Sequence, residues 1–183
     1  MQDISLHILD LTQNSISADA TEITILIDER PSKDWLTVSI RDNGKGMPPE
    51  MVERVTDPFV TTRTTRKVGL GLPLFKQNAI QSGGDMTITS EQGVGTYLEA
   101  TFGYSNIDRL PLGDIANTVM MLVSSNPLIR FIFEYKYESE QYTFDTIEIN
   151  EALDGMPINT PPIIKYLMEM IRENMESAKN LKN

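Results

Sequence analysis

Two segments of the chain, residues 22–28 and 35–42, place apolar side chains at every second position, and this alternation constrains the fold more than any other feature. Because successive side chains of a strand point to opposite faces, it predicts two strands with one buried face. Asp42 continues the inward series of the second segment, so a carboxylate ends a buried apolar stripe. The inward-facing residues are Ile23, Ile25 and Ile27 in the first segment, and Leu36, Val38 and Ile40 in the second.

A helix is predicted before these strands, over residues 4–16. Apolar residues recur there at helical spacing and form a stripe that ends at Ser15. Three polar residues share a different face of this helix, so side chains that can bind a ligand or react project from one side of it. The stripe begins with Ile4, Ile8 and Leu11, and the polar face carries His7, Asp10 and Asn14.

Glycines and prolines after Asp42 end the second strand, and a mixed pattern of helices and strands continues to residue 103. Residues 56–71 have no regular period and predict a loop. The expected elements are a short helix opened by Pro48 and Pro49, a helix over 72–82 that stops at Gly83 and Gly84, and strands over 85–90 and 96–103. This mixture predicts an α/β fold class.

The pattern changes at residue 104, and the chain divides into two parts, residues 1–103 and residues 104–183. The second part begins with a linker-like stretch and continues with a helix, a β-hairpin and a final helix. The predicted ranges are 106–113 for the linker, 114–125 for the helix, 128–137 and 141–149 for a hairpin that turns at 139–140, and 161–178 for the last helix. We expect this part to pack on the first or to bind a partner.

Composition narrows the classes of function. The 183 residues carry a formal net charge of −10, which argues against nucleic-acid binding because phosphate backbones are bound by clustered Lys and Arg. The absence of cysteine excludes disulfides, thiolate metal sites and cysteine nucleophiles. No apolar run approaches the ~20 residues of a membrane span, and the first residues lack a signal-peptide pattern. We therefore expect a soluble cytoplasmic protein without membrane contact.

Four short segments occur in an informative order along the first part of the chain. They are residues 10–14 (DLTQN) on the first helix, 42–47 (DNGKGM) after the second strand, 57–72 before a helix, and 93–96 (GVGT) before a strand. Each segment alone is a weak signal. Together they resemble the ATP-binding domain of the GHKL superfamily, which includes DNA gyrase, sensor histidine kinases, mismatch-repair ATPases and anti-sigma kinases. The resemblance covers residues 3–103.

The resemblance implies a Bergerat-type ATP-binding fold. This is an α+β two-layer sandwich with one mixed, mostly antiparallel sheet and helices on one face, here followed by a C-terminal α/β extension. The family domain usually begins with a helix and a strand that are missing before the first helix of this chain. We expect the hairpin and the final helix to replace them from the other end of the chain, which a hairpin forming a separate sheet would contradict.

The base-binding end of the implied site involves the second and fourth segments. Asp42 matches the family residue that accepts the exocyclic amino proton of adenine; a guanine carbonyl there would face a carboxylate, acceptor against acceptor. Gly44 and Gly46 allow the backbone to pass close to the base, with Met47 beside them. Thr96 matches the threonine whose hydroxyl helps hold adenine. The alternative interpretation of Asp42 is a carboxylate that caps the glycine turn.

The phosphate-binding end involves the third segment. Residues 69–72 (GLGL) place a glycine loop at a helix start, where backbone N–H groups and the helix dipole favour anions. Four basic side chains and no acidic one lie between residues 58 and 84, and the alternative interpretation is a solvated basic loop. The resemblance implies a lid over the nucleotide, with Arg63 or Lys67 at the γ-phosphate. The site residues expected here are Thr62, Arg63, Lys67, Gly69, Leu70, Gly71 and Leu72.

The first segment supplies the expected metal ligand and base. Magnesium prefers hard oxygen ligands, and Asn14 can offer its carboxamide oxygen. Asp10 lies one helical turn earlier; the ATPase branches of the family usually have Glu there, which polarises the attacking water or hydroxyl. Asp10 has the chemistry of a general base but is one methylene shorter, so a merely solvated carboxylate is the alternative. His7 is interpreted as a structural residue rather than a phosphate acceptor.

Two functions of different classes remain open from the sequence. The first is Mg–ATP binding with phosphoryl transfer, either slow ATP hydrolysis or phosphorylation of a partner protein. The second is a non-enzymatic, ATP-dependent interaction module whose lid and C-terminal part bind a protein partner. The expected cofactors of the first are ATP and Mg²⁺, and both functions predict a protein partner or substrate.

Overall fold

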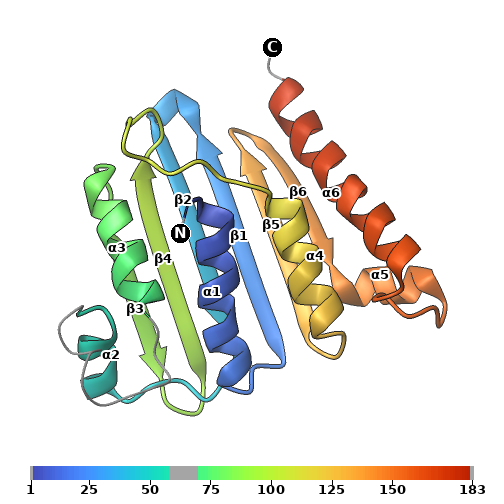
Figure 1. Cartoon of the computed structure of the whole chain (residues 1–183), viewed down its shortest axis with the longest axis horizontal. Coiled ribbons are helices and arrows are strands. Elements are labelled where there is room, and N and C mark those ends of the chain that lie inside the picture. The colour runs from blue at the N-terminus through green and yellow to red at the C-terminus, as the bar shows by residue number, and fades with distance from the viewer. Residues whose placement is uncertain (1, 58–69, 182–183) are drawn as a thin grey trace.

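The computed structural model describes residues 2–57 and 70–181. Six strands form one sheet in the order β3-β4-β2-β1-β5-β6, and helices α1, α3 and α4 cover one of its faces (Figure 1). The elements are α1 (Ile4–Ser17), β1 (Glu22–Arg30), a 3₁₀ helix (Pro31–Lys33), β2 (Trp35–Asp42), α2 (Pro49–Val55), α3 (Gly71–Gln81), β3 (Met86–Glu91), β4 (Gly95–Gly103), α4 (Ile115–Ser125), β5 (Arg130–Tyr137), β6 (Glu140–Asp145), α5 (Thr146–Leu153) and α6 (Pro161–Asn180).

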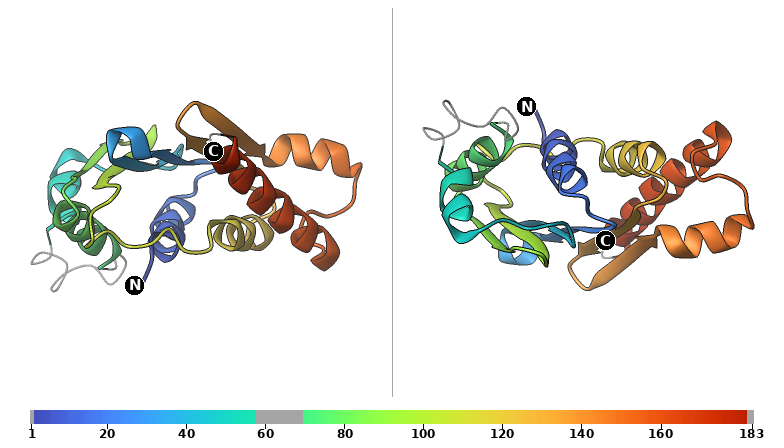
Figure 2. Two further views of the ribbon diagram at one scale, coloured as in Figure 1. Left: turned by 90° about the horizontal axis from the view of Figure 1, so that it is seen from above. Right: turned by 90° about the horizontal axis from the view of Figure 1, so that it is seen from below.

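The sheet is mixed, because β1 and β5 run parallel while every other neighbouring pair is antiparallel. Seen along the sheet, the helices α1, α3 and α4 lie on one side of it (Figure 2). The predicted fold class, an α+β two-layer sandwich with a mostly antiparallel sheet, is therefore confirmed.

The core forms where α1 packs on the centre of the sheet. Ile25 and Ile40 are register partners of β1 and β2, and the predicted inward-facing residues of both strands are at most 4% exposed. The α1 stripe of Ile4, Ile8 and Leu11 is equally buried. Alternation in the strands and helical spacing in α1 thus bring two apolar surfaces together, and burial of apolar area is the main stabilising contribution to such a core.

The end of α3 shows why the glycine pair stops a helix. Gly83 has φ +84°, a conformation that favours glycine. Its N–H donates to the Ile80 carbonyl at 3.0 Å, and the N–H of Gly84 donates to the Ala79 carbonyl at 2.9 Å. These two bonds are the Schellman motif, which satisfies the last carbonyls of the helix.

The hairpin of β5 and β6 belongs to the same sheet as the first part of the chain. β5 lies parallel beside β1, with Ile25 opposite Phe133, and β6 continues the sheet at its edge. In the second layer, α4 packs beside α1 and contacts α6. Residues from both parts of the chain therefore share one sheet and one core.

One predicted strand is partly wrong. The sequence predicts a strand over 141–149, but β6 ends at Asp145 and α5 begins at Thr146. The Asp145 side chain accepts a hydrogen bond from the N–H of Ile147 at 3.0 Å and so caps α5. Glu148 follows three residues after this cap, which is the spacing of a helix-starting capping box and the signal that the apolar pattern obscured.

Helix α6 is attached to the sheet through a buried carboxylate. The inward series of β1 ends on Glu29, which is 3% exposed. Glu29 accepts a hydrogen bond from the Tyr135 hydroxyl at 2.6 Å and forms an ion pair with Lys179 of α6 at 3.1 Å. Because a buried charge is costly without partners, this contact ties α6 to the sheet. Among the described helices, α6 included, none combines the length and apolar character needed to cross a bilayer.

Candidate functional site

A pocket of about 350 Å³ lies between the helix layer and the sheet. Its walls are mainly apolar, and its polar groups come from α1, the end of β2, the following loop and the start of β4. A concave, apolar site with a few polar groups is the usual form of a small-molecule site. The apolar lining includes Leu11, Ile40, Met47, Met51, Leu72, Ile88 and Leu98, and the polar lining includes Asn14, Ser15, Asp42, Lys45 and Thr96.

Asp42 is held at one end of this pocket by two donors from different elements. Ser15 of α1 donates its hydroxyl proton to Asp42 Oδ2 at 2.6 Å, and the backbone N–H of Gly44 donates to Asp42 Oδ1 at 2.9 Å. The carboxylate is half-buried, and among the described residues each of its oxygens accepts only one of these bonds, which leaves further lone pairs for a ligand. Asp42 can therefore accept a hydrogen bond from a ligand in the pocket. The alternative interpretation, in which Asp42 only caps the glycine turn, accounts for the bond from Gly44 but not for the bond from Ser15.

The loop after β2 is held in place by hydrogen bonds to the Asn43 side chain and by the close approach of its backbone to the turn between β3 and β4. Asn43 Oδ1 accepts from the backbone N–H groups of Thr21 and Glu22, each at 2.9 Å. Gly46 has φ +67°, and a Cβ on it would lie 2.0 Å from the carbonyl oxygen of Glu91. Glycine is therefore required where this loop passes the turn between β3 and β4.

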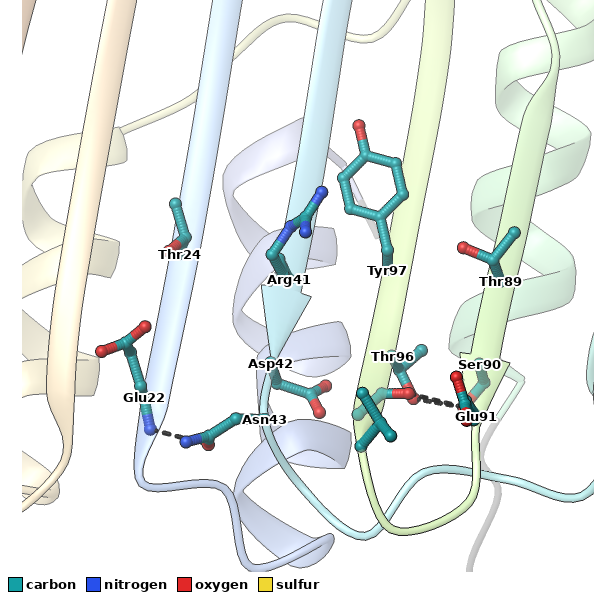
Figure 3. A pocket seen from close by; sticks show the side chains of 12 residues that line it. Glu22, Thr24, Arg41, Asp42, Asn43, Thr89, Ser90, Glu91, Thr96 and Tyr97 are labelled. Atoms are coloured by element: carbon teal, nitrogen blue, oxygen red, sulfur yellow. Dashed lines mark hydrogen bonds between the residues drawn. The ribbon is translucent and has the colours of Figure 1, made fainter.

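Thr96 lies beside Asp42 because the two residues are register partners of β4 and β2 (Figure 3). Thr96 Oγ1 is 2.8 Å from Ser90 Oγ, which accepts from the N–H of Met47 at 2.9 Å and donates to the Gly95 carbonyl at 3.0 Å. The single hydroxyl proton of Ser90 goes to Gly95, so Thr96 donates to Ser90. Its remaining lone pairs make Thr96 a second acceptor at this end of the pocket.

Asn14 and Asp10 differ in their relation to the pocket. Asn14 is exposed and lines it, and within the described part of the chain its side chain forms no hydrogen bond. Asp10 is exposed one turn earlier and lines a neighbouring hollow of about 300 Å³ between α1 and α4. A Cβ on Gly71 would lie 2.0 Å from Asp10 Oδ2, so the carboxylate rests against the first residue of α3. The predicted metal ligand thus faces the pocket, and the predicted base lies against the start of α3.

The predicted phosphate-binding residues are only partly described. Leu72, at the start of α3, lines the pocket, whereas Leu70 and Gly71, the two residues before it, do not line it. Of the described residues, no group of three or more Asp, Glu or His side chains is placed to hold a metal ion. The other predicted members of this segment, Thr62, Arg63, Lys67 and Gly69, lie outside the described residues.

His7 is buried between α1 and α3, as a structural residue would be. It is 1% exposed, its Nε2 lies 2.9 Å from Asn78 Nδ2, and its ring packs on Phe75 at 5.0 Å between centroids. Burial lowers the pKa of the His7 imidazole and is the largest influence on it. The ring is packed in the interior and does not line the pocket.

A second hollow, of about 470 Å³, lies on the face of the sheet that carries no helix (Figure 3). Arg41 and Tyr97 project into it, and the Arg41 guanidinium stacks on the Tyr97 ring at 4.7 Å. Asp42 and Thr96 lie at its rim, yet their side chains point to the opposite face because side chains alternate along a strand. The bond from Ser15 of α1 to Asp42 confirms this direction. The pocket on the helix side is therefore the candidate site.

Sequence reasoning missed two serines that organise the site. In the sequence Ser15 only ends the apolar stripe of α1, yet in the structure its hydroxyl donates a hydrogen bond to Asp42. Ser90 connects Met47 with Thr96. A serine in an otherwise apolar buried stripe was a usable signal for Ser15, because a buried hydroxyl needs a partner. Nothing in the local pattern around Ser90 distinguished it from a surface residue of an edge strand.

Fold and pocket together define a two-layer α/β domain with a pocket between its helices and its sheet. Residues 2–106 match the sequence model of the family described as "Histidine kinase-, DNA gyrase B-, and HSP90-like ATPase". The match covers more than half of the chain, and the chain belongs to this family. The resemblance to the GHKL superfamily is thereby confirmed.

Curated relatives carry a similar segment within much longer proteins. The sensor histidine kinase WalK of Bacillus subtilis (strain 168) is 34% identical over 111 residues, which cover 56% of this chain and 18% of WalK. A putative sensor protein of Shewanella frigidimarina (strain NCIMB 400) is 33% identical over 109 residues, covering 58% of this chain and 17% of that protein. The chain thus spans less than a fifth of the length of these relatives.

Solved structures share the fold over more of the chain. The MutL ATPase domain of Aquifex aeolicus, complexed with ADP, superposes with a TM-score of 0.51 at 18% identity, covering 84% of this chain and 68% of that one. The N-terminal domain of a DNA repair protein superposes with a TM-score of 0.56 at 14% identity, covering 78% and 52%. At these identities the likeness establishes the fold.

Proposed function

We propose that the protein binds Mg–ATP in the pocket between α1 and the sheet and uses it for phosphoryl transfer. The observation that carries the proposal is the Asp42 carboxylate, held by Ser15 and Gly44 with free lone pairs at the end of an apolar pocket. An acceptor there matches the exocyclic amino group of adenine, and the apolar walls suit a purine ring. Membership of an ATPase family supports the same ligand.

Asn14 is the residue proposed to hold magnesium. Its carboxamide lines the pocket without a partner in the described part of the chain, and an amide oxygen is a hard ligand of the kind Mg²⁺ takes. Asn14 would hold magnesium at this end of the pocket, and the metal would supply positive charge that offsets the charge of the phosphates. The neighbouring start of α3 would place backbone N–H groups toward the phosphates.

Asp10 is the proposed general base. An attacking water or hydroxyl would give its proton to Asp10 as its oxygen bonds to the γ-phosphorus. The bond between the γ-phosphorus and the bridging oxygen would then break, with ADP leaving. The contact of Asp10 with Gly71 brings this carboxylate to the start of α3 despite the shorter side chain. The acceptor would be water in an ATPase or a partner side chain in a protein kinase.

The second candidate function is an ATP-dependent interaction module without turnover. It is favoured by the position of Asp10, which lines a neighbouring hollow rather than the pocket itself. In this function the ATP-bound protein contacts a protein partner, with the C-terminal part contributing to the contact. The two candidates agree on ATP binding and differ only in turnover.

Asp10→Asn separates the two candidates. If Asp10 is the base, this variant keeps ATP affinity within a few-fold but lowers phosphate release by about 10²–10⁴, the usual contribution of a positioned acid or base. Asp154→Asn, which removes an exposed carboxylate at the end of α5, is the matched control and should behave as wild type. Phosphate release from γ-labelled ATP measures both, with Asn14→Ala as the background for contaminating activity.

If wild-type release equals the Asn14→Ala background while ATP still binds tightly, the module is favoured over the enzyme. Incubation with γ-labelled ATP and cell lysate then shows whether a partner protein takes the label.

A further inference from the structure

Ser15 makes an unusual bond for a serine inside a helix. It is 4% exposed in the inward stripe of α1, where its neighbours one and two turns earlier are Leu11 and Ile8. Helical serines commonly return their hydroxyl proton to a carbonyl of the preceding turn. Ser15 instead donates across the core to Asp42 Oδ2 at 2.6 Å, 27 residues away in the chain.

This bond and the bond from Gly44 set the direction of the carboxylate. A carboxylate group has about four lone-pair sites, two on each oxygen. The N–H of Gly44 occupies one site on Oδ1 at 2.9 Å, and the Ser15 hydroxyl occupies one on Oδ2. With one donor on each oxygen, from a loop and from a helix, rotation about the last bond of the side chain is restrained. The free lone pairs are then presented to the pocket that both Ser15 and Asp42 line.

We infer that Ser15 is a positioning residue that sets the base specificity of the pocket by orienting Asp42. The inference rests on the proposed function, because it names what makes the pocket choose adenine. A carboxylate held in one direction fits an N–H donor of the adenine amino group, whereas the carbonyl of guanine would oppose it, acceptor against acceptor. Without Ser15, the carboxylate turns about its remaining bond to Gly44 and loses this direction.

The test measures ATP and GTP affinity by calorimetry in the full chain. Ser15→Ala should weaken ATP binding by about tenfold, the lower end of the effect of a hydrogen bond to a charged group, and leave GTP binding within about threefold. The control is Ser5→Ala, which removes the hydroxyl of another buried serine of α1. Ser5 donates a hydrogen bond to Asp3 Oδ1 at 2.7 Å, and neither residue lines the pocket. Ser5→Ala should keep the wild-type ratio of ATP to GTP affinity.

A double-variant cycle shows whether Ser15 acts through Asp42. In an Asp42→Asn background, adding Ser15→Ala should change the ratio of ATP to GTP affinity by less than about twofold, because the carboxylate it orients is already gone. An additional tenfold change would overturn the inference. A general loss of packing would weaken ATP and GTP equally, and this outcome would also count against it.

Different experimental results would contradict the inference about Ser15 and the proposed function. Wild-type protein that binds ATP and GTP equally, or binds neither, would contradict the proposed function. Wild-type protein that prefers ATP, with the same preference in Ser15→Ala, would overturn only the role of Ser15. If Ser15→Ala does not fold, Ser15→Cys is the alternative variant, because cysteine has a similar volume and is only a weak hydrogen-bond donor. A ratio of ATP to GTP affinity unchanged from wild type in Ser15→Cys would equally overturn the role of Ser15.

Discussion

At the scale of single residues, the chemistry of the pocket is concentrated in one carboxylate. Asp42 presents acceptors to the pocket, and Asp42→Asn would present an amide N–H₂ group in place of one oxygen. We expect ATP affinity to fall by about tenfold to a hundredfold, while GTP affinity holds or improves because its carbonyl meets a donor. Calorimetry with both nucleotides measures the change, and Asp154→Asn controls for the lost charge. An unchanged preference for ATP in Asp42→Asn would contradict the assigned role.

The burial of His7 leads to a prediction about how the stability of the fold depends on pH. Burial places its pKa in the folded protein below the value near 6.5 expected when unfolded. The unfolded chain therefore takes up a proton before the folded protein does, so stability is complete above about pH 6.5 and is lost as pH falls toward the folded pKa.

Unfolding by urea between pH 7.5 and 5.5 tests this prediction. The free energy of unfolding of the wild type should decrease over this range, and His7→Gln should remove most of the decrease, because His7 is the only histidine. An equal decrease in both proteins would mean that another group is responsible.

At the scale of elements, the pocket depends on two loops that pass closely enough to exclude a side chain. Gly46 and Gly93 both have positive φ, at +67° and +82°, so alanine at either position is strained by about 1 kcal/mol. They differ in their surroundings. A Cβ on Gly46 would collide with the Glu91 carbonyl, whereas one on Gly93 would meet no atom within 4 Å.

This difference makes Gly93→Ala a control for Gly46→Ala. We expect Gly93→Ala to lose about 1 kcal/mol of stability and to keep ATP affinity within about threefold. Gly46→Ala should displace the loop that carries Met47 and lower ATP affinity by about tenfold or more, since forced overpacking costs about 1–3 kcal/mol. Calorimetry and urea unfolding distinguish the two effects. Equal ATP affinities in the two variants would show that the close contact is unimportant.

At the scale of the whole molecule, residues from both parts of the chain build one sheet, and α6 is tied to β1 through the Lys179–Glu29 ion pair. We propose that the two parts unfold as one unit. Lys179→Met leaves the buried Glu29 without its cation and should cost about 1–3 kcal/mol. Lys165→Met changes an exposed lysine of the same helix and should stay within about 0.5 kcal/mol.

The only tryptophan, Trp35, lies at the start of β2 and reports on the first part of the chain. Its fluorescence transition in urea should move to lower concentration in Lys179→Met and stay in place in Lys165→Met. If the C-terminal part unfolded independently, the Trp35 transition would be the same in both variants.

Much of the site was predictable because its signals are local. The alternation that ends on Asp42, the helical spacing of Asn14 and the glycines of the loop each depend on residues a few positions apart. Such patterns follow from the periods of strands and helices and from the freedom of glycine, which act wherever the segment lies in the fold. The roles of Thr62, Arg63, Lys67 and Gly69 stay predictions of the same kind.

The sequence by itself therefore determined most of the elements, the family and the candidate residues, whereas only the tertiary structure decided which of them meet. The pairing of Thr96 with Asp42, the bond from Ser15, the parallel place of β5 beside β1 and the contact of Asp10 with Gly71 all join residues distant in the chain. These contacts depend on strand order and on how helices pack over the sheet. Both are set by burying apolar surface across the whole molecule, so no local pattern records them.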